Sequence, residues 1–179
     1  MKNVFLFDCM NTVFDLQNVP SAAVAQYAGQ RLVKKTAVGS PATRTAAQWR
    51  PLDLDPSFSA AKLHPDAEDG LARLRSQFEV YAFTNCPIPW VERICDGWAN
   101  AIFSGIVPLE YCGWFKPAPV VYPWAAGWIG VPCENCTVVT ANPSFGDIEG
   151  AKSCGMKFEL IRCPGAIANI RLLADKYGC

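Results

Sequence analysis

The stretch Val4-Phe5-Leu6-Phe7-Asp8-Cys9-Met10-Asn11-Thr12-Val13 places an apolar run directly before a carboxylate, with a hydroxyl four positions after it. A continuous apolar run predicts a strand that is buried on both faces, as in a parallel sheet. In open α/β sheets, ligands bind just beyond the carboxyl ends of the strands. Asp8 is therefore the first candidate for chemistry, and the alternative is an aspartate that only caps the following turn.

Apolar runs alternate with helical patterns along most of the chain. Strands are expected at 3–8, 79–84, 101–106, 137–141 and 157–161, and helices at 21–33, 65–78, 117–129 and 166–177. This alternation predicts an α/β fold with a parallel sheet. The pattern changes at residues 14–64, where an alanine-rich helix precedes a stretch rich in Ser, Thr, Ala and Pro with no strand signal. We interpret residues 1–13 and 65–179 as the core and residues 14–64 as a short α-helical cap inserted after the first strand.

Size and charge restrict the function classes. The chain has 179 residues, a length that suits one domain. Its 16 Lys and Arg balance 16 Asp and Glu, so no net charge attracts it to nucleic acid or to an anionic membrane. We expect a small-molecule substrate, and we leave a homodimer open. There is no apolar run near the ~20 residues of a membrane span, and the first residues lack a signal-peptide cleavage site. A cytoplasmic location is therefore expected.

The nine cysteines are interpreted as mostly reduced, because their number is odd and the chain is larger than disulfide-rich scaffolds. Cys133-Glu134-Asn135-Cys136 has the spacing of metal ligands, but zinc needs two further soft ligands and His64 is the only histidine. The favoured interpretation is a surface turn leading into the strand at 137–141, with Cys136 packed as a small apolar residue. His64 itself is predicted to be an exposed turn residue.

Polar side chains lie at the ends of three further elements of the core. They are Thr84-Asn85 after one strand, Lys116-Pro117 before a helix, and Asn142 with Asp147 after another strand. Each has an ordinary explanation alone, as a turn, a surface lysine or a helix cap. Together they predict an ammonium beside Asp8, which would keep that carboxylate ionised and nucleophilic.

With these residues in place, the sequence resembles the haloacid dehalogenase superfamily over nearly its whole length. The four matching motifs are Phe7 to Val13, Phe83-Thr84-Asn85, Lys116 to Tyr122, and Val139 to Asn142 followed by Gly146 to Lys152. The resemblance implies a Rossmann-like three-layer core with a parallel β-sheet and a small helical cap. It also implies that Asp8 is the nucleophile of a hydrolase.

The departures from the motifs favour the 2-haloacid dehalogenase branch. Phosphatases of the superfamily have a second aspartate where this chain has Met10, and a metal-binding carboxylate where it has Asn142. Dehalogenases of the superfamily lack that aspartate, use asparagine in the fourth motif and have a tyrosine at the spacing of Tyr122. The pair Thr140 and Asn142 resembles their Ser-x-Asn.

The implied reaction is attack of Asp8 on the carbon that bears a halogen, followed by hydrolysis of the ester, with no metal. The resemblance assigns catalytic roles to Asp8, Lys116, Asp147 and Asn142, and substrate binding to Thr12, Thr84, Asn85, Tyr122, Met10 and Thr140. No cofactor is expected, although Asp8 and Asp147 could hold Mg²⁺ weakly. Halide departure also needs a cap arginine, for which Arg31 and Arg44 are the candidates.

Two alternatives stay open. Asp147 follows Asn142 by five residues, a spacing nearer to the phosphatase branch, so phosphoryl transfer is the second hypothesis. Met10 also replaces an aromatic residue of the dehalogenases, and Asn11 replaces their glycine. A non-catalytic relative that binds a small molecule is the third hypothesis, and the intact Asp8 and Lys116 argue against it.

Overall fold

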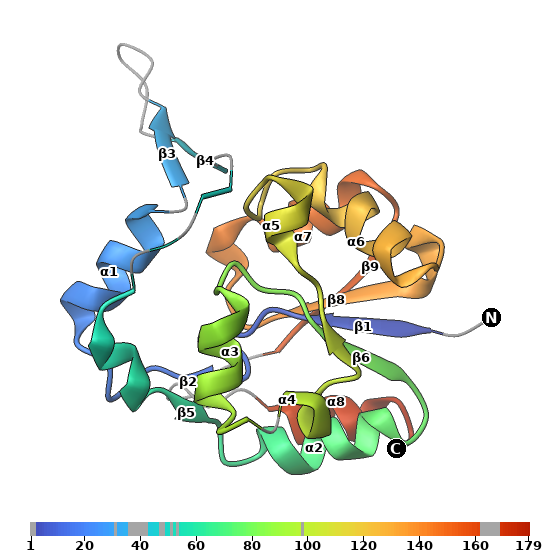
Figure 1. Cartoon of the computed structure of the whole chain (residues 1–179). Coiled ribbons are helices and arrows are strands. Elements are labelled where there is room, and N and C mark those ends of the chain that lie inside the picture. The colour runs from blue at the N-terminus through green and yellow to red at the C-terminus, as the bar shows by residue number, and fades with distance from the viewer. Residues whose placement is uncertain are drawn as a thin grey trace.

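A five-stranded parallel sheet forms the centre of the computed structural model, which describes residues 3–30, 32–35, 43–46, 49–50, 52, 54–97, 99–161 and 169–179 (Figure 1). The strand order is β7-β6-β1-β8-β9, and neighbouring strands pair in parallel. The strands are β1 (Val4–Phe7), β6 (Glu79–Ala82), β7 (Gly105–Ile106), β8 (Cys136–Thr140) and β9 (Lys157–Leu160). The α/β fold with a parallel sheet is therefore confirmed.

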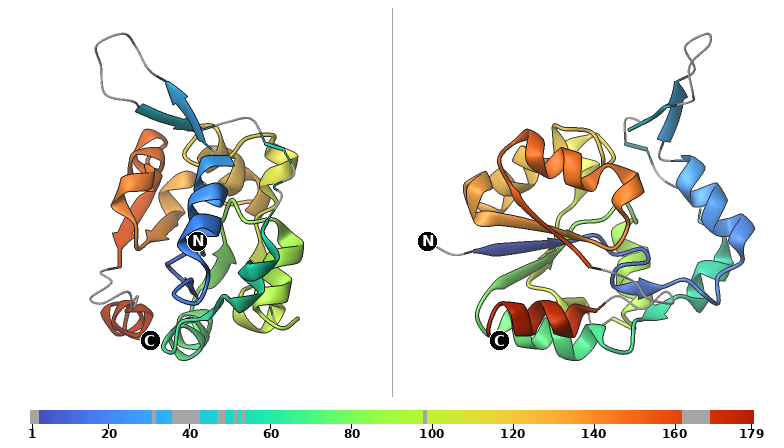
Figure 2. Two further views of the ribbon diagram at one scale, coloured as in Figure 1. Left: turned by 90° about the vertical axis from the view of Figure 1, so that its left-hand side faces the viewer. Right: turned by 180° about the vertical axis from the view of Figure 1, so that it is seen from behind.

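Helices cover both faces of this sheet, which gives the molecule three layers (Figure 2). In Figure 1, α2 and α8 lie below the sheet and α6 and α7 lie above it. The helices are α1 (Ser21–Gln30), α2 (Ala67–Arg75), α3 (Ile88–Ile94), α4 (Ala99–Ile102), α5 (Leu109–Cys112), α6 (Val121–Ile129), α7 (Asp147–Ser153) and α8 (Ile170–Lys176). The described residues also form the short 3₁₀ helices η1 (Pro56–Ala60), η2 (Cys133–Asn135) and η3 (Pro143–Phe145).

The apolar run of β1 supplies both halves of the core. Phe5 and Phe7 belong to the apolar cluster that contains the buried residues of α2 and α8. Val4 and Leu6 belong to the cluster that contains the buried apolar residues of α6 and Ala151 of α7. Successive side chains of a strand point to opposite faces of the sheet, so only an uninterrupted apolar run can serve two covered faces.

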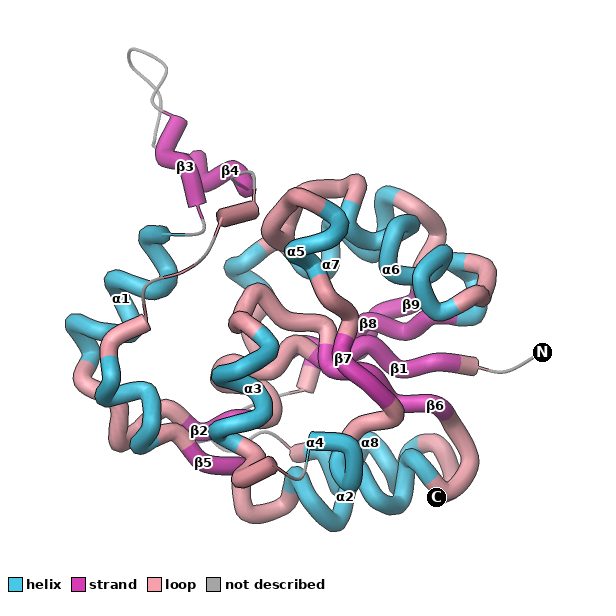
Figure 3. Tube along the Cα trace, viewed as in Figure 1, coloured by secondary structure: helices cyan, strands magenta, loops and turns pink. Residues whose placement is uncertain are grey.

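The strand order puts the end of β1 at the point where the chain changes direction in the sheet. After β1 the chain builds β6 and β7 on one side of it, and then β8 and β9 on the other. Asp8 follows β1 directly, and the carboxyl ends of β1 and β8 point to the side on which α1 lies (Figure 3). Such a switch point is where open α/β sheets bind their ligands.

Several elements differ from the expected bounds. The strand expected at 101–106 is only Gly105–Ile106, because residues 99–102 form α4 and bury Ala99 and Ile102 as a short helix. As an edge strand, β7 pairs with β6 alone. The helix expected at 117–129 begins at Val121, and α8 begins at Ile170, while residues 166–168 lie outside the described part.

Residues 14–64 are not purely helical. The helix expected at 21–33 ends at Gln30, and the antiparallel pair β3 (Leu32–Lys35) and β4 (Thr43–Ala46) follows it. A second antiparallel pair, β2 (Phe14–Asp15) and β5 (Lys62–Leu63), connects the two ends of the segment. The sequence prediction missed these strands because two to four residues without apolar alternation carry no period-two signal.

Within the described part of the chain, no helix is long and apolar enough to cross a membrane.

Candidate active site

Asp8 is held at the end of β1 by contacts to β8 and to its own loop. Its backbone N–H donates to the carbonyl of Val139 at 2.9 Å. The Thr12 hydroxyl donates to Asp8 Oδ2 at 3.2 Å, and Thr12 Oγ1 accepts from the Ala141 N–H at 3.0 Å. Thr12 therefore links the Asp8 carboxylate to Ala141, just after β8, and this hydrogen bond orients Asp8 Oδ2.

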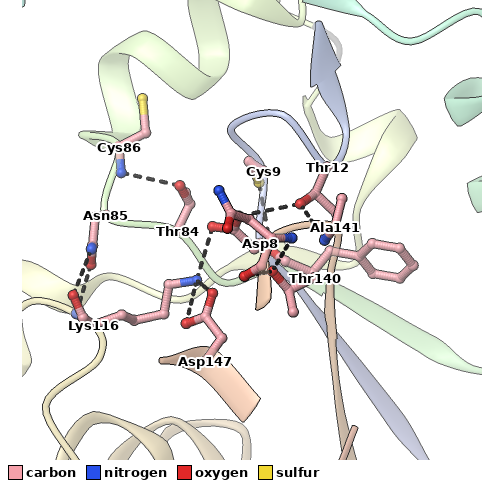
Figure 4. Close-up of polar contacts among 12 residues, drawn as sticks. Asp8, Cys9, Thr12, Thr84, Asn85, Cys86, Lys116, Thr140, Ala141 and Asp147 are labelled. Atoms are coloured by element: carbon pink, nitrogen blue, oxygen red, sulfur yellow. Dashed lines mark hydrogen bonds and ion pairs between the residues drawn. The ribbon is translucent and has the colours of Figure 1, made fainter. Parts of the chain in front are cut away.

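Lys116 brings two carboxylates together (Figure 4). Its Nζ lies 2.9 Å from Asp8 Oδ1 and 3.3 Å from Asp147 Oδ1. All three residues are buried. The same ammonium lies 4.9 Å from the centre of the Phe83 ring, where a cation is attracted to the aromatic face. The cation predicted beside Asp8 from the sequence therefore lies between two acids, at the junction of three segments.

The charges of this cluster depend on each other. Burial alone would lower the pKa of Lys116, but the carboxylates of Asp147 and Asp8 outweigh it and raise that pKa above its ordinary value. Burial also raises the pKa of Asp147; the Asp8 carboxylate adds to the effect, while Lys116 and the Tyr122 hydrogen bond oppose it. Lys116 thus stays charged, and Asp147 is a carboxylate that accepts a proton more readily than an exposed aspartate.

Asn85 positions Lys116 through its backbone. The Asn85 amide donates to the Lys116 carbonyl at 2.9 Å, and its Oδ1 accepts from the Lys116 N–H at 2.7 Å. Asn85 also lines the cavity described below. Thr84 is buried, and its Oγ1 accepts from the Cys86 N–H at 3.1 Å. Thr84 thus stabilises the turn after β6, and Asn85 holds the backbone of Lys116, whose side chain contacts Asp8.

Tyr122 lies behind Asp147. Its hydroxyl donates to Asp147 Oδ1 at 3.0 Å, and its side chain is fully buried. An added Cβ on Gly150 would come within 2.0 Å of the Tyr122 ring, so α7 approaches α6 closely here. Tyr122 is absent from the cavity wall in the described structure, so its contact is with Asp147 rather than with the space where a substrate would lie.

The fourth motif is also arranged differently from the expectation. Asn142 Oδ1 accepts from the Ser144 N–H at 3.0 Å and caps η3, while its backbone N–H donates to Thr140 Oγ1 at 3.2 Å. Neither Asn142 nor Thr140 lines the described cavity. The residues from which catalytic and substrate contacts were expected therefore shape the turn that carries the chain from β8 to Asp147.

A small, partly open cavity lies over Asp8. Its polar wall contains Asp8, Asn11, Asn85, Lys116 and Asp147, and its apolar wall contains Met10, Leu16, Val24, Tyr27, Ala28 and Phe145. Six residues of this wall were not predicted from the sequence to belong to the site: Asn11, Leu16, Val24, Tyr27, Ala28 and Phe145. Helical spacing could have shown that residues 24, 27 and 28 share one face of α1, because residues three and four positions apart are neighbours.

Three further charged or titratable residues were singled out in the sequence, namely Arg31, Arg44 and His64. Arg31 and the side chain of Arg44 lie outside the described residues, so the expectation of a cap arginine stays a prediction. His64 was expected to be exposed, and this is wrong: the residue is 2% exposed. Its backbone N–H donates to the Val13 carbonyl at 2.9 Å, which draws the residue under the loop that follows Asp8.

Asp8 and Asp147 are the carboxylates that could hold a metal ion beside the cavity. The Lys116 ammonium already contacts both. In the described structure no group of three or more His, Cys, Asp or Glu side chains is arranged to hold an ion. Met10 lines the cavity with a thioether, a poor ligand for Mg²⁺, which prefers oxygen.

Comparison with known proteins gives a structural likeness without a sequence match. No family model and no curated protein matches the chain. The structure resembles the defluorinating L-2-haloacid dehalogenase Rha0230, with a TM-score of 0.73 and 16% identity over 99% of this chain and 96% of that one.

Two further solved structures resemble this chain, and they differ from each other in the molecule they contain. L-2-haloacid dehalogenase from Xanthobacter autotrophicus, solved with chloropropionic acid covalently bound, has a TM-score of 0.66 and 16% identity over 99% of this chain and 83% of that one. CbbY from Rhodobacter sphaeroides, in complex with phosphate, has a TM-score of 0.60 and 17% identity over 90% of this chain and 87% of that one. The TM-scores show a shared fold, and at 16–17% identity the likeness shows the fold alone.

Proposed function

We propose that this chain, which has the fold of the haloacid dehalogenase superfamily, is a hydrolase that uses Asp8 to displace halide from a small 2-halocarboxylic acid. The observation that carries the proposal is the position of Asp8 in the cavity wall, with one oxygen on Lys116 and the other on Thr12. An ionised carboxylate held from both sides is oriented for attack on an atom in the cavity.

The proposed reaction has two steps. In the first, an Asp8 oxygen bonds to the carbon that bears the halogen, and the carbon–halogen bond breaks as halide leaves with the electron pair. In the second, water adds to the ester carbonyl of Asp8, the hydroxy acid departs, and the carboxylate is restored. Asp147 accepts a proton from that water in the proposal, because it lines the cavity and its pKa is raised by burial.

Met10 and Asn142 support a reaction that needs no metal. Phosphatases of the superfamily have carboxylates at these two positions, where this chain has the thioether of Met10 and the carboxamide of Asn142. The carboxamide oxygen accepts a hydrogen bond from the Ser144 N–H. Mg²⁺ is bound through carboxylates together with waters and substrate phosphates. With Lys116 already between Asp8 and Asp147, the charge that would bind this ion is partly neutralised.

Leaving-group stabilisation is the part of the proposal that depends on the cap. Among the described residues of the cavity wall, Lys116 is the cation, and it is shared by two carboxylates. A departing halide would be repelled by this pair of acids unless a further cation approaches. We therefore retain Arg31 and Arg44 as the proposed halide-binding residues.

Phosphoryl transfer is the second candidate, on two observations. Asp147 follows Asn142 by five residues, and the chain shares its fold with the phosphate-bound CbbY. This candidate would need Mg²⁺ to neutralise charge on the phosphoryl group, and Asp8 with Asp147 would be its carboxylate ligands.

A substrate panel distinguishes the two candidates. Chloride, bromide and fluoride release from 2-halopropionates and haloacetates would be measured beside phosphate release from p-nitrophenyl phosphate, each with EDTA and with Mg²⁺. The proposal predicts halide release that EDTA leaves unchanged. Phosphate release that depends on Mg²⁺ would favour the second candidate, and neither product would indicate a non-catalytic relative.

A single turnover in H₂¹⁸O then tests the ester. Water that attacks the Asp8 carbonyl leaves its oxygen in the protein, whereas water that attacks the substrate carbon leaves it in the hydroxy acid. The proposal predicts label in a peptide that contains Asp8 and unlabelled product from the first turnover. Label found in the first product would contradict a nucleophilic role for Asp8.

A further inference from the structure

Asn11 lies in the loop after the proposed nucleophile Asp8, and it forms part of the cavity wall. Its φ angle is 60°, in the left-handed region that residues other than glycine adopt infrequently. The Asn11 N–H donates to the Phe14 carbonyl at 2.9 Å, which fixes this loop through the backbone. Glycine would adopt the same angle without steric cost. The backbone therefore does not require a carboxamide here, and the place of Asn11 beside the cavity points to a contact with a ligand.

The charges beside the cavity are unfavourable for the acid group of the substrate. With all three groups ionised, Asp8 and Asp147 carry two negative charges and Lys116 carries one positive charge. A 2-halocarboxylate is itself an anion, so this cluster repels its carboxylate. An N–H group can bind a carboxylate without a charge of its own, and such a hydrogen bond is stronger than one between two neutral groups. The substrate carboxylate therefore needs a donor outside the Lys116 cluster.

Asn11 is the better placed of the two side-chain amides in the described part of the cavity wall. The other is Asn85, which is buried and faces the backbone of Lys116, where its amide donates at 2.9 Å and its oxygen accepts at 2.7 Å. Asn11 is exposed. The helix α1 contributes a mostly apolar part of the wall, from Val24, Tyr27 and Ala28. That part suits the carbon chain of a substrate and leaves the polar wall to its acid group.

We propose that Asn11 is a further substrate-binding residue, whose carboxamide N–H donates a hydrogen bond to the carboxylate of the substrate. The inference rests on the proposed function, because it assigns the halogen-bearing carbon to Asp8 and the acid group to Asn11. A neutral amide suits this position, since a cation there would pair with Asp8 and compete with the substrate for it.

Two substitutions separate the carboxamide from the backbone that carries it. Asn11→Gly removes the amide and keeps a residue that adopts this φ angle. With 2-chloropropionate it should raise KM about tenfold and leave kcat within about twofold, because a hydrogen bond to a charged group is lost in ground state and transition state alike. Asn11→Asp keeps the size, suits the left-handed region and places a carboxylate against the substrate. It should raise KM at least about tenfold further.

Asn100→Asp is the matched control, because it adds the same charge at an exposed position of α4, outside the described cavity wall. Its KM should equal that of the parent protein. Both Asn11 variants should unfold cooperatively, close to the melting temperature of the parent. A parent-like KM in Asn11→Gly would overturn the inference, and so would a lower melting temperature or kcat with KM unchanged. If one Asn11 variant fails to fold, the other decides.

Binding of propionate separates this inference from the proposed function. Propionate has the carboxylate and the carbon chain but no leaving group, so its binding does not depend on turnover. In calorimetric titrations the parent protein should bind propionate about tenfold more tightly than Asn11→Gly does. This difference in a parent that releases no halide would overturn the proposed function and support the contact between Asn11 and a carboxylate. Equal affinities, including no detectable binding by either protein, would overturn the inference.

Discussion

Lys116 Nζ lies 2.9 Å from Asp8 Oδ1, although the two residues are 108 positions apart in the sequence. Both are buried, and Asp147 completes the cluster from α7. The buried ammonium compensates the desolvation of both carboxylates, so its removal would leave two buried negative charges without a partner. This interdependence gives the cluster several testable properties.

Asp8→Asn tests the nucleophile. The variant should lower kcat by a factor on the order of 10⁴ or more, because a neutral amide is a poor nucleophile. The change is nearly isosteric, and the amide oxygen can still accept from Thr12, so the thermal transition should remain cooperative. Mass spectrometry must exclude deamidation back to aspartate. Turnover at the parent rate by intact asparagine protein would end the assignment.

Lys116→Met tests the charge cluster. Leaving Asp8 and Asp147 without their cation should destabilise the fold by about 3 to 5 kcal/mol near neutral pH, as measured by urea unfolding. The difference should shrink as pH falls and Asp147, whose pKa is raised by burial, takes up a proton. It should also shrink as pH rises through the raised pKa of Lys116.

The matched control for that variant is Lys176→Met. Lys176 pairs with Glu159 at 2.7 Å, but its side chain is 60% exposed. Exposed ion pairs contribute little to stability, so this variant should unfold close to the parent protein. Equal losses from the two lysines would contradict the view that burial makes the Lys116 cluster special.

Tyr122→Phe tests the role of the residue behind Asp147. The Tyr122 hydrogen bond lowers the pKa of Asp147, against the larger effect of burial. Its removal should raise that pKa further, so the acid limb of kcat/KM should move to higher pH. An unmoved acid limb would show that Asp147 is not the group whose deprotonation limits activity.

Gly150→Ala tests the close approach of α7 to α6. Its Cβ would overlap the Tyr122 ring at 2.0 Å, so we expect a loss of about 1 to 3 kcal/mol and reduced activity as Tyr122 is displaced. The control is Gly127→Ala in α6, where an added Cβ meets nothing within 4 Å. That change should stabilise the helix by up to about 1 kcal/mol. Equal effects at both positions would contradict the steric explanation.

Met10→Asp combined with Asn142→Asp tests the metal. Restoring two carboxylates should increase Mg²⁺ affinity at least about tenfold over the parent protein in calorimetric titrations, since Mg²⁺ binds through carboxylates. The parent protein should keep its activity in EDTA. Micromolar Mg²⁺ binding by the parent would contradict the metal-independent proposal and favour phosphoryl transfer.

Local patterns were sufficient for the framework of the fold. The apolar run before Asp8 predicts a strand with two covered faces, and the alternation of runs predicts the parallel sheet, because both signals lie within a few consecutive residues. The short strands β2, β3, β4 and β5 gave no such signal. His64 was misjudged because its burial depends on a hydrogen bond to Val13, a residue 51 positions earlier.

From the sequence alone, Asp8, Lys116 and Asp147 could be assigned to one edge of a parallel sheet, since each follows or precedes an identifiable element. Which groups touch one another depends on the three-dimensional packing. It turned the Asn142 carboxamide toward Ser144, placed the Tyr122 hydroxyl on Asp147, and put Tyr27 of α1 into the cavity wall. Side-chain direction depends on packing against residues from distant segments, and that packing carries no local periodic pattern.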